Sequence, residues 1–173
     1  MNIGGILLAL QGAASQGILW GVLVLGVYIT YKILDIADLT VDGSFALGGC
    51  VCATLVVTHG MNPILALVIA TLAGMIAGAV TGLLHTAFDI PAILAGILTQ
   101  IALWSINLRI MGKSNIPLLK TKTIFSSFVE VTGLKSSQAS GLIGIIIAVV
   151  IIVALYWFFG TEIGSALRAT GNN

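Results

Sequence analysis

Charged residues are scarce in this chain of 173 residues: seven Lys or Arg and six Asp or Glu make up 8% of it, against 58% hydrophobic residues. An average soluble domain has about 25% charged residues, and the mean hydropathy of +1.15 lies outside the range of such domains. The formal net charge of +1 gives no basic surface for nucleic acid and no polybasic patch for anionic lipid. We therefore expect membrane lipid to surround most of the protein, and no nucleic-acid partner.

The residues that most enzymes and metal sites require are also few. Cys50 and Cys52 are the two cysteines, and without His or carboxylate neighbours they are predicted to be packing residues rather than a disulfide or metal site. His85 and Asp89 are interpreted as a structural pair or a helix end rather than as catalytic groups. No Gly-rich loop ends in Lys-Ser or Lys-Thr. The sequence thus predicts no metal, cofactor or nucleotide site, and an integral membrane enzyme is the least favoured class.

Hydrophobic runs are abundant. A helix needs about 20 largely apolar residues to cross the hydrocarbon core of a membrane, and five runs approach that length: 18–34, 45–58, 63–88, 91–111 and 141–160. Proline opens the third and fourth runs, at a position where a helix tolerates its missing N–H. The sequence predicts an all-α, polytopic membrane protein with about five crossing helices in a single transmembrane domain, 1–173.

Three carboxylates crowd into the segment 35–44, between the first two runs. If this segment is an ordinary loop, Asp35, Asp38 and Asp42 are hydrated, and Asp42 or Ser44 caps the next helix. The alternative is a helix broken within the membrane, whose free N–H or C=O groups line a cavity for a polar solute. The second run is short for a full crossing. It becomes long enough only if part of this segment lies within the membrane.

Small and amide residues mark two of the other runs. The spacing of Gly74, Gly78 and Gly82 places them on one helical face and predicts close packing against another helix. Gln100 and Asn107 are seven residues apart and share nearly the same face of the fourth run. They either form hydrogen bonds between helices or provide a polar lining for a translocation path.

Two motifs resemble those of a known family. The run Asp-Leu-Thr-Val-Asp-Gly-Ser-Phe-Ala-Leu-Gly-Gly at 38–49 resembles the signature near the second span of permeases that serve branched-chain amino acid and ribose-type ABC importers. It is most similar to a subgroup predicted to import aromatic amino acids such as tryptophan. The run Gly-Ser-Ala-Leu-Arg-Ala-Thr-Gly-Asn-Asn at 164–173 resembles the opening of their cytoplasmic coupling segment, expected here over 161–173. The order of spans agrees over essentially the whole chain.

The resemblance implies partners and site residues. The coupling segment of such permeases fits a groove of the ATPase subunit, which implies ATPase contacts for five residues: Gly164, Arg168, Ala169, Gly171 and Asn172. The first motif implies a membrane-embedded break near the transport path, with five candidates: Asp38, Thr40, Asp42, Gly43 and Ser44. A substrate-binding lipoprotein outside the cytoplasm, a second permease copy and a bacterial cytoplasmic membrane are also implied.

Length and orientation raise two further expectations. Similar permeases continue with several more spans, so the chain is expected to be a truncated product or a fragment. The polar stretch 112–140 is expected to form an extramembrane loop, in which Phe125, Phe128 and Val129 anchor a short interfacial helix. Counting Lys and Arg residues would place this loop in the cytoplasm. The resemblance places it outside and Arg168 in the cytoplasm, and we follow the resemblance.

These observations predict the permease subunit of an ATP-binding cassette importer, driven by a separate ATPase. Its solute is predicted to be small and polar, an amino acid with aromatic side chains favoured, delivered by a binding protein. The alternative is a passive channel or an ion-coupled carrier that uses Asp38, Asp42 or Asp89. That alternative predicts flux without ATP.

Overall fold

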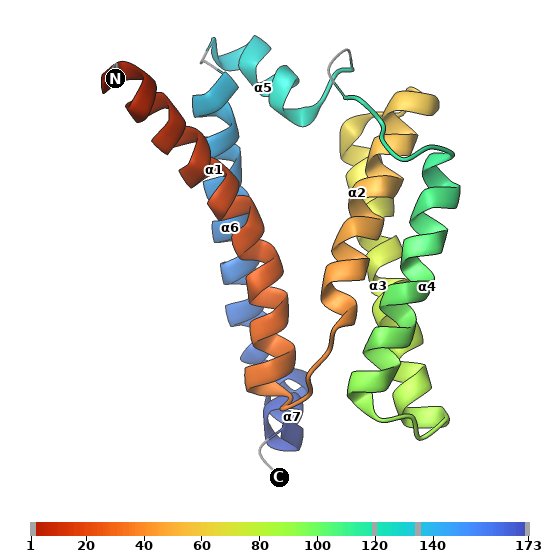
Figure 1. Ribbon diagram of the computed structural model, residues 1–173. Helices are drawn as coiled ribbons and strands as arrows, with labels where there is room; N and C mark the ends of the chain where they lie inside the picture. The colour runs from red at the N-terminus through yellow and green to blue at the C-terminus, as the bar shows by residue number, and fades with distance from the viewer. Residues whose placement is uncertain (1–2, 119–120, 134–135, 172–173) are drawn as a thin grey trace. The chain divides into compact units, whose positions relative to one another are not determined.

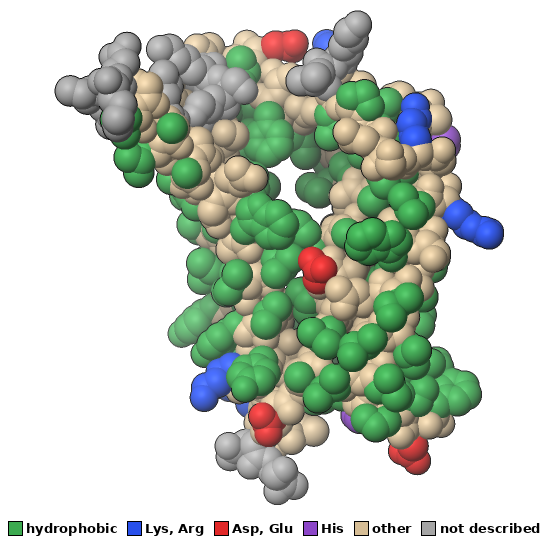
Figure 2. All heavy atoms as spheres, in the orientation of Figure 1, with side chains coloured by type: hydrophobic (Ala, Val, Ile, Leu, Met, Phe, Trp, Pro, Cys, Tyr) green, Lys and Arg blue, Asp and Glu red, His purple; other side chains and the backbone are tan. Residues whose placement is uncertain are grey.

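The computed structural model describes residues 3–118, 121–133 and 136–171, and most of these residues are helical (Figure 1). Within them, five helices are long and apolar enough to cross a membrane: Ala9–Ile33, Thr40–Thr58, Pro63–Ala87, Ala92–Met111 and Gln138–Phe159. Hydrophobic side chains are spread over the visible surface along the helices (Figure 2), and Trp104 and Tyr156 are 73% and 85% exposed. The predicted all-α, polytopic membrane protein is confirmed.

The chain folds as two compact units, one of residues 1–35 with 125–173 and the other of residues 36–124. The first unit contains α1 (Ile3–Tyr28), the π-helix η1 (Ile29–Ile33), nearly all of α5 (Ile124–Thr132), α6 (Ser136–Phe159) and α7 (Glu162–Gly171). The second unit contains α2 (Thr40–Thr58), α3 (Pro63–Ala87) and α4 (Ala92–Met111).

In the first unit, α1 and α6 pack along each other through small residues (Figure 1). A Cβ atom added to Gly141 would lie 2.9 Å from Ser15 Oγ, and one added to Gly144 would lie 3.4 Å from Ile18 Cγ2. The buried Ser15 hydroxyl donates a hydrogen bond to the Gln11 carbonyl, 2.9 Å away. Small side chains therefore allow the two backbones to approach closely, as in other membrane helix pairs.

In the second unit, α2 packs against both α3 and α4 around a core of Leu47, Ala77 and Leu103. The start of α3 follows the predicted pattern, since the Asn62 side chain accepts a hydrogen bond from Ile64 N at 2.9 Å and Pro63 is the first helical residue. Helix α4 ends at Gly112, whose φ of +64° is a left-handed conformation that glycine adopts readily.

The break between the first two spans is shorter than the predicted segment 35–44. Helix η1 ends at Ile33, residues 34–39 are non-helical, and α2 begins at Thr40. Asp42, Gly43 and Ser44 therefore lie in the first turns of α2 and not in the break. The predicted break included these residues because they are polar, whereas contacts with α3 and α4 keep them helical.

The predicted short helix in the polar stretch is present as α5. Phe125, Phe128 and Val129 are partly buried, while Ser127 and Glu130 are exposed. This amphipathic pattern fits an interfacial helix, and the extramembrane position of 112–140 stays a prediction.

Candidate functional site

The start of α2 is held by Asp38. Its Oδ1 atom accepts a hydrogen bond from Thr40 N at 2.8 Å, which satisfies one of the free N–H groups at the beginning of the helix. The expectation that the segment is an ordinary loop in which Asp42 or Ser44 caps the next helix is wrong, because both residues lie inside α2. The Ser44 hydroxyl instead donates to the Val41 carbonyl at 3.1 Å.

Gly96 of α4 makes room for this helix start. A Cβ atom at Gly96 would lie 2.9 Å from Leu39 N and 3.2 Å from Asp38 Oδ1. Because real Cβ atoms do not approach a backbone nitrogen so closely, glycine is required here for the observed packing. The sequence interpretation did not select Gly96, although the small residues Ala95, Gly96 and Thr99 form the kind of pattern that it used on α3.

A buried pair of hydroxyl groups joins the start of α2 to α3. Thr40 Oγ1 and Thr81 Oγ1 are 2.7 Å apart, and the two residues are only 1% and 7% exposed. Thr81 Oγ1 also lies 3.4 Å from the Ala77 carbonyl, to which it can donate. Both hydroxyls are thus satisfied inside the unit, and the pair joins the start of α2 to α3.

These contacts set the depth of the helix start. Thr81 lies six residues before the end of α3 at Ala87, and Gly96 lies four residues after the start of α4 at Ala92. At about 1.5 Å per residue, α2 begins roughly 9 Å from the end of α3 and 6 Å from the start of α4. Since α4 is about 30 Å long, the thickness of the hydrocarbon core, α2 begins within the depth that these helices span.

Asp42 lies deeper still. Its carboxylate accepts a hydrogen bond from Gln100 Nε2 at 3.3 Å, and Gln100 is the ninth of the 20 residues of α4. The adjacent Gly43 confirms the register, because an added Cβ would lie 3.3 Å from Gln100 Cα. Asp42 is nevertheless exposed on the surface of this unit. A charged group near the middle of a membrane helix requires water or protein beside it.

The structure separates Gln100 from Asn107. Gln100 is partly exposed and bonded to Asp42, whereas Asn107 is only 8% exposed on the inner side of α4. Asn107 Oδ1 has no hydrogen-bond donor among the described residues. Of the two amides, Gln100 therefore joins two helices and also borders the exposed carboxylate. The two roles expected for Asn107, a hydrogen bond between helices or a polar lining, stay predictions.

The three glycines of α3 differ in their surroundings. A Cβ atom at Gly74 would lie 3.8 Å from the Ser44 carbonyl oxygen, whereas no atom lies within 4 Å of such an atom at Gly78 or Gly82. The contact with the rest of the unit runs instead along a buried stripe of small residues: Ala66, Ala70, Ala77 and Thr81. Close packing at Gly78 and Gly82 stays a prediction, and it would require a partner outside this three-helix unit.

The predicted coupling residues lie in α7 of the first unit. A Cβ atom at Gly164 would overlap the Phe158 carbonyl oxygen, and one at Gly171 would overlap the Ile33 carbonyl oxygen. Arg168 Nη2 donates a hydrogen bond to the Phe159 carbonyl oxygen at 2.7 Å. These three residues therefore pack α7 against α6 and η1. Ala169 is exposed, and Asn172 lies outside the described residues.

The described residues contain no cluster of three or more His, Cys, Asp or Glu side chains able to hold a metal ion. Of the two interpretations of His85 and Asp89, a structural pair or a helix end, the structure supports the helix end: α3 ends at Ala87, and His85 Nδ1 lies 2.8 Å from the Ile90 carbonyl oxygen. Asp89 itself has φ of +55° in the turn that follows α3. This corner of the fold is a turn stabilised by a side chain.

The family of known proteins that matches this chain is described as the branched-chain amino acid transport system permease component, and the match covers residues 9–173. The chain belongs to this family. The predicted resemblance is confirmed.

Two curated proteins are similar to this permease chain. It is 40% identical over 159 residues to the "Tyrosine transport system permease protein" of Clostridioides difficile (strain R20291), covering 92% of this chain and 50% of that protein. It is 40% identical over 114 residues to an uncharacterised protein of Rickettsia prowazekii (strain Madrid E), covering 66% of this chain and 40% of that protein. The chain thus spans half or less of the length of these relatives. No solved structure matches it significantly.

Proposed function

We propose that this chain belongs to the transmembrane subunit of an ATP-binding cassette importer that moves an amino acid, with aromatic amino acids favoured. The family match over residues 9–173 supports the transport class. The relative from Clostridioides difficile, described as part of a tyrosine transport system, supports the substrate class. In this proposal the two units together form one permease domain in a bacterial cytoplasmic membrane.

The observation that carries the proposal is the exposed Asp42 carboxylate, paired with Gln100 halfway along α4. A solute with a charged ammonium group needs polar partners at this depth, because the hydrocarbon core supplies none. We place Asp42 and Gln100 beside the translocation path. Asp38 caps the start of α2 at Thr40, two residues before Asp42. In this proposal Asp38 therefore stabilises the helix that forms the wall of the path.

Energy comes, in this proposal, from a separate ATPase that contacts the exposed surface of α7, including Ala169. A substrate-binding lipoprotein delivers the solute from the opposite side, and a second permease copy completes the path. Gly164, Arg168 and Gly171 act in this scheme by fixing α7 to α6 and η1. A shift of α7 is then transmitted to the end of the first span.

The test begins with purification of the tagged protein from its own host in mild detergent, and mass spectrometry of the intact proteins that accompany it. The complex is then reconstituted in liposomes, and uptake of radiolabelled tyrosine, leucine and ribose is measured with and without ATP. We expect an ATPase to co-purify and tyrosine uptake to require ATP. Copurified ATPase with uptake of leucine or ribose alone would retain the transport class and overturn the substrate.

The exposed carboxylate at membrane depth also favours a second candidate, an ion-coupled carrier. In such carriers an intramembrane Asp binds the coupling ion. The same liposomes distinguish the two, because a carrier gives uptake driven by an imposed ion gradient in the absence of ATP and of any partner protein.

A further inference from the structure

A pocket with two cations lies where η1 meets α7 in the first unit. Lys32 and Arg168 are 136 residues apart in the sequence, yet both line this cavity of about 580 Å³ together with Tyr28, Ala169 and Gly171. Among the described residues, no carboxylate lines it. The composition predicted no basic patch for anionic lipid. The fold creates a small one by bringing together residues from the two ends of the unit.

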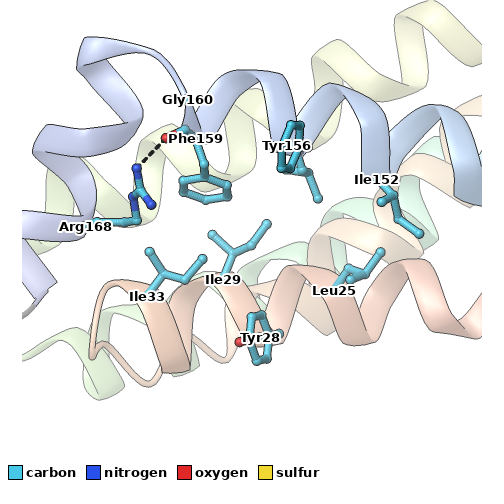
Figure 3. Close-up of a pocket in the computed structure, with 10 residues that line it drawn as sticks. Leu25, Tyr28, Ile29, Ile33, Ile152, Tyr156, Phe159, Gly160 and Arg168 are labelled. Carbon is cyan, nitrogen blue, oxygen red and sulfur yellow. Dashed lines mark hydrogen bonds between the residues drawn. The ribbon is translucent and has the colours of Figure 1, made fainter.

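An apolar groove adjoins this pocket. Its volume is about 500 Å³, and Leu25, Ile29 and Ile33 of one helical face lie opposite Ile152 and Tyr156 of α6 (Figure 3). The groove extends over nine residues on each side, from 25 to 33 and from 152 to 160, and the first and last of them are about 12 Å apart at a rise of 1.5 Å per residue. Tyr28, Ile33 and Arg168 line both cavities, so the cationic pocket and the groove are continuous.

The guanidinium group of Arg168 forms one hydrogen bond at this junction. Nη2 donates to the Phe159 carbonyl oxygen at 2.7 Å (Figure 3), which occupies one of the five N–H donors of an arginine side chain. A carbonyl oxygen does not neutralise the positive charge, as a carboxylate would. The long Lys32 side chain is exposed at the rim, where an ammonium group can reach the membrane surface while its methylene groups remain among apolar atoms.

We propose that the pocket and the groove together bind one anionic phospholipid. The phosphate group lies between Lys32 and Arg168, and one acyl chain lies along Leu25, Ile29 and Ile152. Basic pockets between membrane helices are suited to anionic headgroups, and a tyrosine at this level, here Tyr28, is typical of the membrane interface. Charge complementarity and the continuity of the two cavities favour a lipid over a soluble anion, because a soluble anion leaves the groove without an occupant.

The bound lipid would join the end of the first span to α7. Gly171 already packs against the Ile33 carbonyl oxygen, and the lipid phosphate adds an electrostatic link between Lys32 and Arg168 beside this contact. The position of α7 then depends on the presence of anionic lipid. This inference concerns the membrane chain alone and holds whether or not an ATPase is the partner.

The experiment measures binding of phosphatidylglycerol and phosphatidylcholine to the purified full-length protein in neutral detergent by native mass spectrometry. Lys32→Gln is the main variant, since Arg168 also belongs to the segment proposed to face the ATPase. Lys113→Gln is the matched control, because Lys113 is an exposed lysine of the other unit. A third variant, Ile29→Trp, fills the groove without changing charge.

We expect Lys32→Gln to weaken phosphatidylglycerol binding about fivefold, the effect of one surface cation on anionic lipid, and to leave phosphatidylcholine binding unchanged. Lys113→Gln should bind both lipids as the unmodified protein does. Ile29→Trp should weaken phosphatidylglycerol binding while all three variants retain the same helical content by circular dichroism.

Equal binding of the two lipids by the unmodified protein would overturn the proposal. So would unchanged phosphatidylglycerol binding by Lys32→Gln. Inorganic phosphate that displaces phosphatidylglycerol at equal concentration would show a phosphate site with no role for the acyl chain, and would reject the lipid as the occupant.

Discussion

Gln100 donates a hydrogen bond to Asp42 across 3.3 Å and so joins α4 to α2 halfway along α4. The two residues are 58 positions apart and belong to helices that pack in register through Gly43. Exposing a carboxylate to lipid at this depth costs free energy. We therefore predict that this face of α2 and α4 contacts water or protein.

We predict that Asp42→Asn lowers transport at least tenfold and changes the free energy of unfolding by less than about 1 kcal/mol, because the bond is exposed and its loss is partly compensated. Uptake by liposomes and unfolding in a denaturing detergent measure the two effects. Asp89→Asn is the control, since Asp89 lies in the turn after α3, and it should transport normally. Equal transport by both variants would remove Asp42 from the path.

Gly96→Ala should destabilise the protein by about 1–3 kcal/mol, the usual range for an overpacked core. The added Cβ would meet Leu39 N at 2.9 Å, and a backbone atom cannot rotate away. Gly78→Ala is the matched control on α3, with no atom within 4 Å of its added Cβ. It should leave stability unchanged or raise it by up to about 1 kcal/mol, because alanine favours the helix. Equal losses for the two variants would contradict the close approach at Gly96.

The hydroxyl pair of Thr40 and Thr81 is suited to a double-mutant cycle. Each single change to Val should cost about 0.6 kcal/mol, the average for hydrogen bonds between membrane helices, and at most about 1.7 kcal/mol. The double variant should lose less free energy of unfolding than the two single variants lose together, because the second change removes a hydroxyl that has already lost its partner. Strict additivity in unfolding measurements would mean that the two hydroxyls do not interact.

The orientation of the first unit can be tested with single cysteines. Ser126 lies in α5 before α6, and Thr170 lies in α7 after it, so the 24-residue α6 separates them. In a background with Cys50 and Cys52 changed to Ala, we expect Ser126→Cys to react with an impermeant thiol reagent on intact cells. Thr170→Cys should react only after lysis. The reverse pattern would place α7 outside and exclude its contact with a cytoplasmic ATPase.

The spans could be predicted from the sequence because lipid imposes long apolar helices, and the five runs match the five helices. The first and last residues of the helices were harder to predict. Helix α1 begins at Ile3, well before the predicted 18, since Ser15 lowers the local hydropathy but packs against Gly141. Helix α2 begins at Thr40 because Thr81, 41 residues later, satisfies its hydroxyl. Such partners are distant in the sequence and leave no local signal.

The candidate site was predictable in part. The segment around Asp38 and Asp42 stood out because charges are rare, and the structure places Asp38 just before α2 and Asp42 in the first turn of that helix. Gly96 was not singled out, because glycine is common in membrane helices. Glycine is required at this position only because Leu39 approaches it closely. The cationic pocket was equally hidden, because Lys32 and Arg168 are isolated charges in the sequence.

The order of the helices has a consequence for biosynthesis. Helices α2, α3 and α4 follow one another in the chain and pack together, so this group can assemble as soon as α4 has left the ribosome. Helix α1 packs against α6, and α6 ends at Phe159. At 5–20 residues per second, α1 waits roughly ten seconds in the membrane without its partner. During that interval the face of α1 around Ser15, which packs against α6 in the folded protein, is not yet covered. We expect the insertion machinery to protect this face.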